Sequence, residues 1–298
     1  MKRIFIVVIL VVIAGVAGLV RMQSRSRSAE QQALATGGES SGQAGEAREE
    51  IRKSYRLAPD AQVTISGING RVDIKTSDTD TAEVYVLRTA SSRDNLTRRQ
   101  VIIEDSPSSL VIRAENNGGW WARLWGRTPQ EQITINAPRR IALRLKGING
   151  RVNGTDVEGA LEVSGINGKV ELSGVKGSAK ISGINGNISV GLRELMGNGV
   201  QASGVNGNVE FRLPVGLNAE LVAKGLNGKV RSEIPEVSVD QAEYGSHYAA
   251  HLGSGGAPIN ISGINGNVVL TRLAAPLEVL GEKPGSQKKS AANAKPAL

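Results

Sequence analysis

The chain has 298 residues with 37 glycines, no cysteine and only 3% aromatic residues, and its formal net charge is +8. The absence of cysteine excludes disulfides, thiolate metal sites, cysteine nucleophiles and lipid attachment through an N-terminal cysteine. Most of the net charge lies near the two ends, because residues 55–273 carry 24 basic and 21 acidic side chains. The chain lacks both a concentrated basic face and interleaved aromatic residues, so we expect no nucleic-acid partner.

The first residues predict a membrane segment. Lys2 and Arg3 precede an uncharged apolar run from Ile4 to Val20, and as a helix this run would span about 25 Å, close to the thickness of a bilayer core. We expect a signal anchor or transmembrane helix at residues 1–21, and its cleavage as a signal peptide stays open. The body would then lie in the periplasm or outside the cell, attached to the cell membrane as a single-pass protein.

Two further segments are poor in core residues. Residues 22–58 are rich in Ser, Gly, Gln, Ala and charged residues, a composition typical of a flexible linker. Residues 274–298 have the composition of a disordered basic tail. The remaining residues, 59–273, are therefore expected to form one domain.

A repeated motif, Gly-(Ile/Leu/Val)-Asn-Gly, dominates this domain. Central copies are 18 or 21 residues apart, and weaker copies such as "GVKG" at 174–177 lie halfway between them, so the underlying unit has about nine residues. Alternating apolar residues followed by a three-residue step predict a short strand and a corner. Asn and Gly suit the corner because they tolerate positive φ. The first glycines are Gly67, Gly147, Gly165, Gly183, Gly204, Gly225 and Gly263.

The period predicts an all-β fold, which we expect to be a β-solenoid of stacked 18–21-residue coils. An antiparallel β meander or sandwich is the alternative, because Asn-Gly between alternating runs also signals hairpins. The solenoid is preferred because a fixed period with an inward Ile at the corner suits coils that contact only their neighbours. Corner side chains would then form a turn ladder, with coils about 4.8 Å apart. Its members are Asn149, Asn167, Asn185, Asn206, Asn227 and Asn265.

The sequence resembles a known family. Strand-like segments such as "QVTISGINGRVDIKTS" precede the repeats, and "RLPVGLNAELVAKGLNGKV" and "INISGINGNVVL" follow. This order is similar to that of the putative adhesin family, the toast-rack or head-GIN type of β-repeat domain, over residues 59–273. The resemblance implies a β-solenoid-like fold and a location in the bacterial cell envelope, often behind an N-terminal membrane segment. It implies no enzymatic activity.

One column of the repeat departs from that family, whose members commonly have Asp after Asn-Gly. Basic or amide residues at these positions make an acidic or cation-binding stripe doubtful. They are either solvated side chains that keep the domain soluble or a mildly basic column for anionic partners such as envelope polysaccharide or lipid headgroups. The column consists of Arg71, Arg151, Lys169, Asn187, Asn208, Lys229 and Asn267.

An insertion at residues 116–129 contains all three tryptophans of the chain beside two arginines. Such a cluster either packs on its own domain as a cap or contacts a membrane interface, a protein or a glycan. It is the candidate site for partner or membrane contact. Its residues are Trp120, Trp121, Arg123, Trp125 and Arg127.

No motif predicts catalysis, a cofactor or a metal. Nucleophile-elbow, phosphate-loop and HExxH motifs are absent, and His247 and His251, four residues apart, lack further ligands. We therefore expect a non-enzymatic, membrane-anchored extracytoplasmic protein that serves as an adhesion or interaction scaffold or as an envelope-stress component. The alternative is a carbohydrate-active β-helix enzyme acting on envelope polysaccharide, which would need clustered carboxylates.

Overall fold

The computed structural model describes residues 46–117, 128–241 and 247–273. This part of the chain is all-β, with nineteen strands hydrogen-bonded into one sheet and one short helix. The expected anchor at 1–21 and the expected tail at 274–298 lie outside the described residues. Among the described residues, no helix has the length and apolar character needed to cross a membrane.

The elements follow one another along the chain with short connections. In chain order they are β1 (Ala47–Arg56), β2 (Ala61–Ser66), β3 (Asn69–Ser77), β4 (Thr81–Ala90), α2 (Arg93–Arg98), β5 (Arg99–Ser106), β6 (Ser109–Asn116), β7 (Gln130–Pro138), β8 (Ile141–Lys146), β9 (Asn149–Thr155), β10 (Glu158–Ser164), β11 (Val170–Asn185), β12 (Ile188–Asn206), β13 (Val209–Leu213), β14 (Ala219–Lys224), β15 (Val230–Ser232), β16 (Val239–Gln241), β17 (Tyr248–Leu252), β18 (Ala257–Asn265) and β19 (Val268–Arg272).

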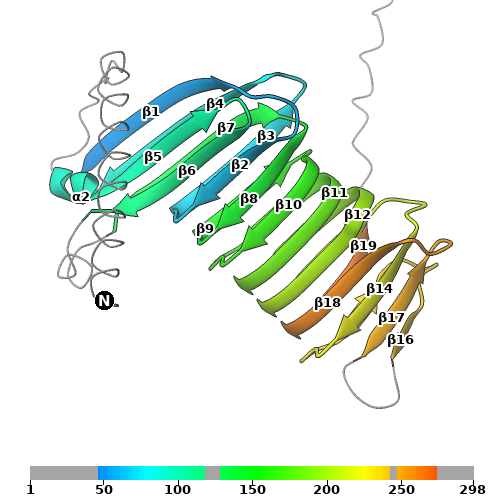
Figure 1. Ribbon diagram of the computed structural model, residues 1–298. Coiled ribbons are helices and arrows are strands. Elements are labelled where there is room, and N and C mark those ends of the chain that lie inside the picture. The colour runs from blue at the N-terminus through cyan, green and yellow to red at the C-terminus, as the bar shows by residue number, and fades with distance from the viewer. Residues whose placement is uncertain (1–45, 118–127, 242–246, 274–298) are drawn as a thin grey trace, which may run out of the picture.

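The strands line two faces that enclose one core, and they stack side by side along the long axis of the domain (Figure 1). The long strands β11 and β12 each cross from one face to the other, which makes the sheet continuous. Face 1 contains β5, β6, β2, β8, β10, the second parts of β11 and β12, then β18, β14, β17 and β16. Face 2 contains β1, β4, β7, β3, β9, the first parts of β11 and β12, then β13, β19 and β15.

Alternating side chains fill the core, as the period-two pattern predicts. Equivalent inward positions of successive coils lie in register, so that Leu145, Val163, Ile181 and Ala202 form one buried row across face 1. The corner isoleucines complete the filling at one side, and Ile166 is only 1% exposed. Aliphatic side chains thus stack on their own copies from coil to coil.

The two positions of each corner require glycine for different reasons. In the copy at 165–168, Gly165 has a φ of +62°, a left-handed conformation that favours glycine. Gly168 has a φ of +149°, and a Cβ there would lie 1.9 Å from the carbonyl oxygen of Gly150 in the neighbouring coil. The first glycine turns the chain, and the second lets the coils approach closely.

The central repeats pair in parallel, as in Leu161 opposite Ala179, 18 residues later. Antiparallel pairs occur at the two ends of the stack, in β1–β4–β7 and β5–β6 at one end and in β14–β17–β16 at the other. The strands before the repeats belong to the same sheet, with β2 and β3 paired to β8 and β9.

Spatial order departs from chain order near the C-terminal end. Consecutive stacking would put the copy at 225–228 directly against the copy at 204–207, but β18 lies between β12 and β14, and β19 lies between β13 and β15. In all seven copies the first glycine has a left-handed φ of +59° to +69°, so the repeat fixes register without fixing which copy follows which. The last coil in sequence is therefore an internal coil in space.

The expected linker at 22–58 requires a correction, because Ala47–Arg56 form β1, paired with β4. Only Ile51 and Tyr55 of this edge strand are apolar residues packed against the core. Another position, Glu49, pairs with Arg88, which is 3% exposed. Burial and the nearby Asp105 raise the pKa of Tyr55 to about 12. Ile51 and Tyr55 are the only large apolar side chains of this strand and are separated by charged and polar residues, so its sequence lacks the alternating pattern that predicts a strand.

Candidate functional site

The corner asparagines form one hydrogen-bonded row along the edge of the stack, which we call the Asn-Gly edge. Each side-chain Nδ2 donates to the Oδ1 of the preceding asparagine at 3.0–3.2 Å. The six asparagines expected in the ladder all take part. Asn69, from the first copy of the motif, adds a seventh member. The spatial order is Asn69, Asn149, Asn167, Asn185, Asn206, Asn265 and Asn227.

A buried ion pair closes the ladder at Asn69. The backbone N–H of Asn69 donates to Glu131 Oε2 at 2.8 Å, and its Nδ2 donates to the carbonyl of Pro129 at 3.0 Å. Glu131 is 1% exposed and accepts from Arg99 Nε at 2.6 Å. Arg99 also donates to the carbonyl of Gly67. The carboxylate thus replaces the carbonyl that a preceding coil would supply.

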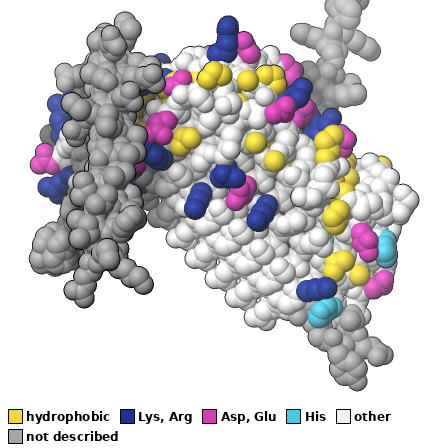
Figure 2. Space-filling model, in the orientation of Figure 1, with side chains coloured by type: hydrophobic (Ala, Val, Ile, Leu, Met, Phe, Trp, Pro, Cys, Tyr) yellow, Lys and Arg dark blue, Asp and Glu magenta, His cyan; other side chains and the backbone are white. Residues whose placement is uncertain are grey.

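Beside the Asn-Gly edge, face 1 carries a row of small hydroxyl side chains, the serine row. Its members stand in register on neighbouring strands, with Lys146 between the first two serines. Figure 2 shows a small group of charged side chains near the middle of this view and a broad uncharged area below it. The serine row consists of Ser66, Ser164, Ser182, Ser203 and Ser262.

The column after Asn-Gly lies on face 2 and has two parts. Its amide members are structural, because the side-chain Oδ1 of Asn187 accepts from Asn208 N at 3.0 Å and that of Asn208 accepts from Asn267 N at 2.9 Å. Among its basic members, Lys169 pairs with Glu171 at 2.7 Å and its hydrogen bond lowers the pKa of that carboxyl. The column is therefore not a uniform basic stripe.

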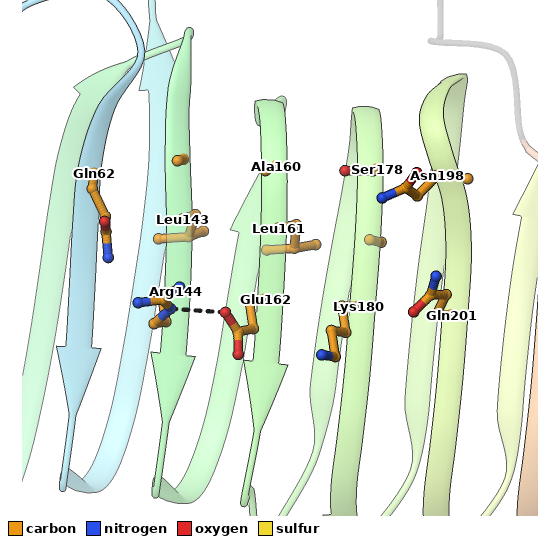
Figure 3. A pocket seen from close by; sticks show the side chains of 13 residues that line it. Gln62, Leu143, Arg144, Ala160, Leu161, Glu162, Ser178, Lys180, Asn198 and Gln201 are labelled. Atoms are coloured by element: carbon orange, nitrogen blue, oxygen red, sulfur yellow. Dashed lines mark hydrogen bonds and ion pairs between the residues drawn. The ribbon is translucent and has the colours of Figure 1, made fainter.

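A shallow groove of about 220 Å³ crosses face 1 over five strands, from β2 to β12 (Figure 3). Its floor has small outward side chains, because Ala142, Ala160 and Ser178 occupy this row. Longer polar side chains border the floor. They are Gln62, Arg144, Glu162, Lys180, Asn198 and Gln201.

One wall of the groove comes from an insertion in β12. The register between β11 and β12 shifts where Gly177 pairs with Leu195 and Ala179 with Val200, so extra residues loop out at 196–199. Gly199 fixes their path, since its φ is +64° and a Cβ there would lie 2.0 Å from the carbonyl oxygen of Pro258. The insertion brings Asn198 to the groove.

The charges of the groove are unequal. Arg144 Nε donates to Glu162 Oε2 at 2.8 Å across neighbouring strands, which largely neutralises that pair. Lys180 stands next to them on an exposed position, and no carboxylate among the described residues forms an ion pair with it. The groove thus presents one uncompensated cation among amide and hydroxyl groups.

Face 2 has a second hollow, of about 590 Å³, near the N-terminal end of the stack. Tyr85 lines it, and the guanidinium of Arg52 lies 5.0 Å from the centre of the tyrosine ring. This cation–π contact covers the aromatic face. The hollow is therefore lined by a cation and an aromatic ring that already contact each other.

The tryptophan cluster and the two histidines are the remaining candidate sites from the sequence. The tryptophans and arginines at 120–127 lie outside the described residues. His247 and His251 are both exposed, and His251 on β17 lies in register with Glu220 on β14. Among the described residues, no three potential ligands come together as a metal site.

No protein-family model and no curated protein matches this sequence. Among solved structures, a putative cell adhesion protein from Clostridium sporogenes ATCC 15579 is 12% identical, with a TM-score of 0.44 over 76% of this chain and 100% of that one. A putative adhesin from Bacteroides fragilis NCTC 9343 is 10% identical, with a TM-score of 0.32 over 74% and 97%. A putative lipid binding protein from Parabacteroides distasonis ATCC 8503 is 15% identical, with a TM-score of 0.24 over 78% and 98%. These likenesses assign neither a ligand nor an activity.

Proposed function

We propose that the protein is a non-enzymatic β-solenoid that is anchored to the cell membrane by residues 1–21 and presents face 1 to a partner outside the cytoplasm. It would act as an adhesion or interaction scaffold of the bacterial envelope, or as an envelope-stress component. The observation that carries this proposal is the exposed polar surface of face 1, where a groove and a row of hydroxyl groups extend over several coils.

The architecture suits a scaffold. Central strands pair in parallel, and the ten strands of face 2, at about 4.8 Å spacing, give a stack about 43 Å long. A stack of this kind holds its surface groups at fixed distances, because every coil is bonded to its neighbours along both faces and along the Asn-Gly edge. Its N-terminal strand β1 lies at one end, so an anchor before it would leave the far end projecting away from the membrane.

The carboxylates of the described residues favour binding over hydrolysis. Glycoside hydrolysis generally needs two carboxyl groups facing one substrate, whereas the groove contains one, Glu162, held by Arg144. On face 2, burial raises the pKa of Glu210, but hydrogen bonds from Ser189 and Arg212 outweigh it and leave the pKa below its ordinary value. A carboxyl held ionised in this way is a poor general acid.

A screen for degradation of envelope glycans tests whether the protein is an enzyme, and turnover abolished by Glu162→Gln would overturn the proposal.

The anchoring and the binding role have separate tests. Fractionation should find the full chain in the membrane fraction and a chain lacking residues 1–21 outside it. The full chain should retain envelope components in a pull-down, and Ala160→Trp, which fills the groove from an exposed position, should reduce that retention. Retention unchanged by this variant and by all other changes on face 1 would remove face 1 as the contact surface.

The tryptophan cluster is a candidate for a second contact, with membrane or partner. The segment that contains the cluster is flanked by Asn117, whose N–H donates to the carbonyl of Arg98 at 2.6 Å, and by Pro129, whose carbonyl accepts from Asn69 at the end of the ladder. We expect a variant with Ser at positions 120, 121 and 125 to lose either thermal stability or binding to liposomes and envelope fractions. A variant unchanged in both would show the cluster to be incidental.

A further inference from the structure

We propose that the groove of face 1 binds a linear, acidic polysaccharide, with Lys180 as the contact for its carboxylate groups. This inference rests on the proposed binding role of face 1 and gives that role a ligand class. It is carried by the shape of the groove, by the chemistry of its border and by the unpaired charge of Lys180.

The shape of the groove suits a chain. It extends from β2 to β12, so it crosses five strands at about 4.8 Å spacing and is about 19 Å long. It is shallow and open, and in Figure 3 the labelled side chains stand along it on successive strands. A small molecule is usually enclosed on most sides, whereas a linear polymer can lie along an open groove and continue beyond its ends.

The border of the groove suits hydroxyl groups. Gln201 and Asn198 each supply a side-chain amide, which has donors and an acceptor, and the hydroxyl of Ser178 lies on the floor. The amide of Gln62 also borders the groove, and its Nε2 donates to Thr64 Oγ1 at 3.3 Å. The methyl groups of Ala142 and Ala160 leave room for a ring to approach. This pattern matches a ligand that presents many hydroxyl groups.

The charge of the groove selects an acid. Arg144 and Glu162 neutralise each other, so Lys180 is the cation left for a ligand. An acidic peptide is a less suitable occupant. The backbone groups below the groove are already paired within the sheet, so a peptide could not add as a strand, and the shallow floor lacks pockets for its side chains.

The test uses the full chain in mild detergent and three probes in calorimetry: a galacturonic-acid hexamer, its methyl-esterified form, and hexaglutamate. The acidic hexamer should bind, and the methyl ester should bind at least about ten-fold more weakly, because it lacks the charge that Lys180 contacts. Raising the salt concentration should weaken binding of the acidic hexamer.

Two groove variants and one control locate the contact. Ala160→Trp should reduce affinity for the acidic hexamer by more than about ten-fold and Lys180→Gln by about ten-fold, whereas Lys224→Gln should stay within about two-fold. Lys224 lies on the same face but outside the groove, and it also has no ion-pair partner among the described residues. Thermal melting of each variant at the wild-type temperature confirms that the fold is intact.

Four results would overturn the inference: no binding of the acidic hexamer, equal binding of its methyl ester, stronger binding of hexaglutamate, or wild-type affinity in either groove variant. These results leave the proposed function standing if the full chain still retains envelope proteins in the pull-down. Loss of all retention by the wild-type chain, with hexamer binding intact, would instead remove the scaffold role and keep the groove as a glycan site.

Discussion

The central coils and the N-terminal end of the stack satisfy the same backbone groups with different chemistry. In the centre, the corner N–H of Asn167 donates to the carbonyl of Ile148 at 2.8 Å, and the next coil repeats this bond. At the N-terminal end no earlier corner lies among the described residues, and the N–H of Asn69 donates to the carboxylate of Glu131 instead. A repeat supplies partners for its own copies, so the first copy needs a partner from sequence outside the repeat.

The difference extends to the core. Arg88 and Glu131 are the charged side chains among the buried residues of the described chain, and both lie at the N-terminal end of the stack. Repeat proteins need end units that differ from their internal units. Here the end unit combines antiparallel strands with a buried ion pair, whereas the internal units use aliphatic rows and amide ladders. Stability should therefore respond to apolar changes in the centre and to charge changes at the end.

The largest effect is expected from Ile166→Asp in a central corner. An unpaired carboxylate at this buried position should lower the free energy of unfolding by more than about 4 kcal/mol. Lys169→Ser, three residues later, should change it by less than about 1 kcal/mol, because the Lys169–Glu171 pair is exposed. Thermal or urea unfolding measures both, and equal midpoints would contradict the faces assigned to these residues.

At the N-terminal end we expect Glu131→Gln to cost about 3–5 kcal/mol, because it leaves the mostly buried Arg99 without its counter-charge. Glu171→Gln is the matched control, since it makes the same chemical change in an exposed pair and should cost less than about 1 kcal/mol. Urea unfolding of the two variants compares them directly. A loss for Glu131→Gln no greater than that of the control would show that the buried pair does not close the stack.

Removing β1 tests the corrected boundary of the domain. A chain that begins at residue 57, and so keeps the buried Leu57, should be about 2–3 kcal/mol less stable than one that begins at residue 46, because Ile51 and Tyr55 no longer cover the core and Arg88 loses Glu49. Thermal unfolding of the two truncated chains measures the difference. Identical melting temperatures would return residues 47–56 to the linker.

The sequence predicts the corners well, because the Asn-Gly motif has a local cause, the need for positive φ and for close approach of the chains. It does not predict the ion pair of Arg99 and Glu131 that closes the ladder, or the spatial order of the last coils. Glu131 resembles any polar residue on an alternating strand, and only the fold places it next to Asn69. Likewise the 21-residue spacing reveals extra residues between Gly183 and Gly204, but not that they border a groove.

A smaller effect is expected within the ladder. Asn185 both donates to Asn167 and accepts from Asn206, so Asn185→Ala removes two side-chain hydrogen bonds and should cost about 1–2 kcal/mol. Asn227 stands at the end of the row and donates to Asn265. Its replacement by Ala should cost about half as much. Urea unfolding measures the difference. A greater loss of stability for Asn227→Ala than for Asn185→Ala would mean that the number of ladder hydrogen bonds does not determine the cost of the substitution.

The smallest expected effect is on the stability of the protein at acidic pH. The folded-state pKa of Glu210 is lowered from 4.5, since the bonds from Ser189 and Arg212 outweigh the opposing effect of burial. Its stabilisation is therefore present above pH 4.5 and is lost as the pH falls through the lower folded-state value. The carboxyl is more than a third exposed, so screening should keep this contribution below about 1 kcal/mol. Glu210→Gln should flatten the loss of stability between pH 5 and pH 3 by about that amount. Arg212→Gln, which keeps the carboxyl but removes a donor, should flatten it in part, and an acid profile unchanged in both variants would place the acid sensitivity elsewhere in the stack.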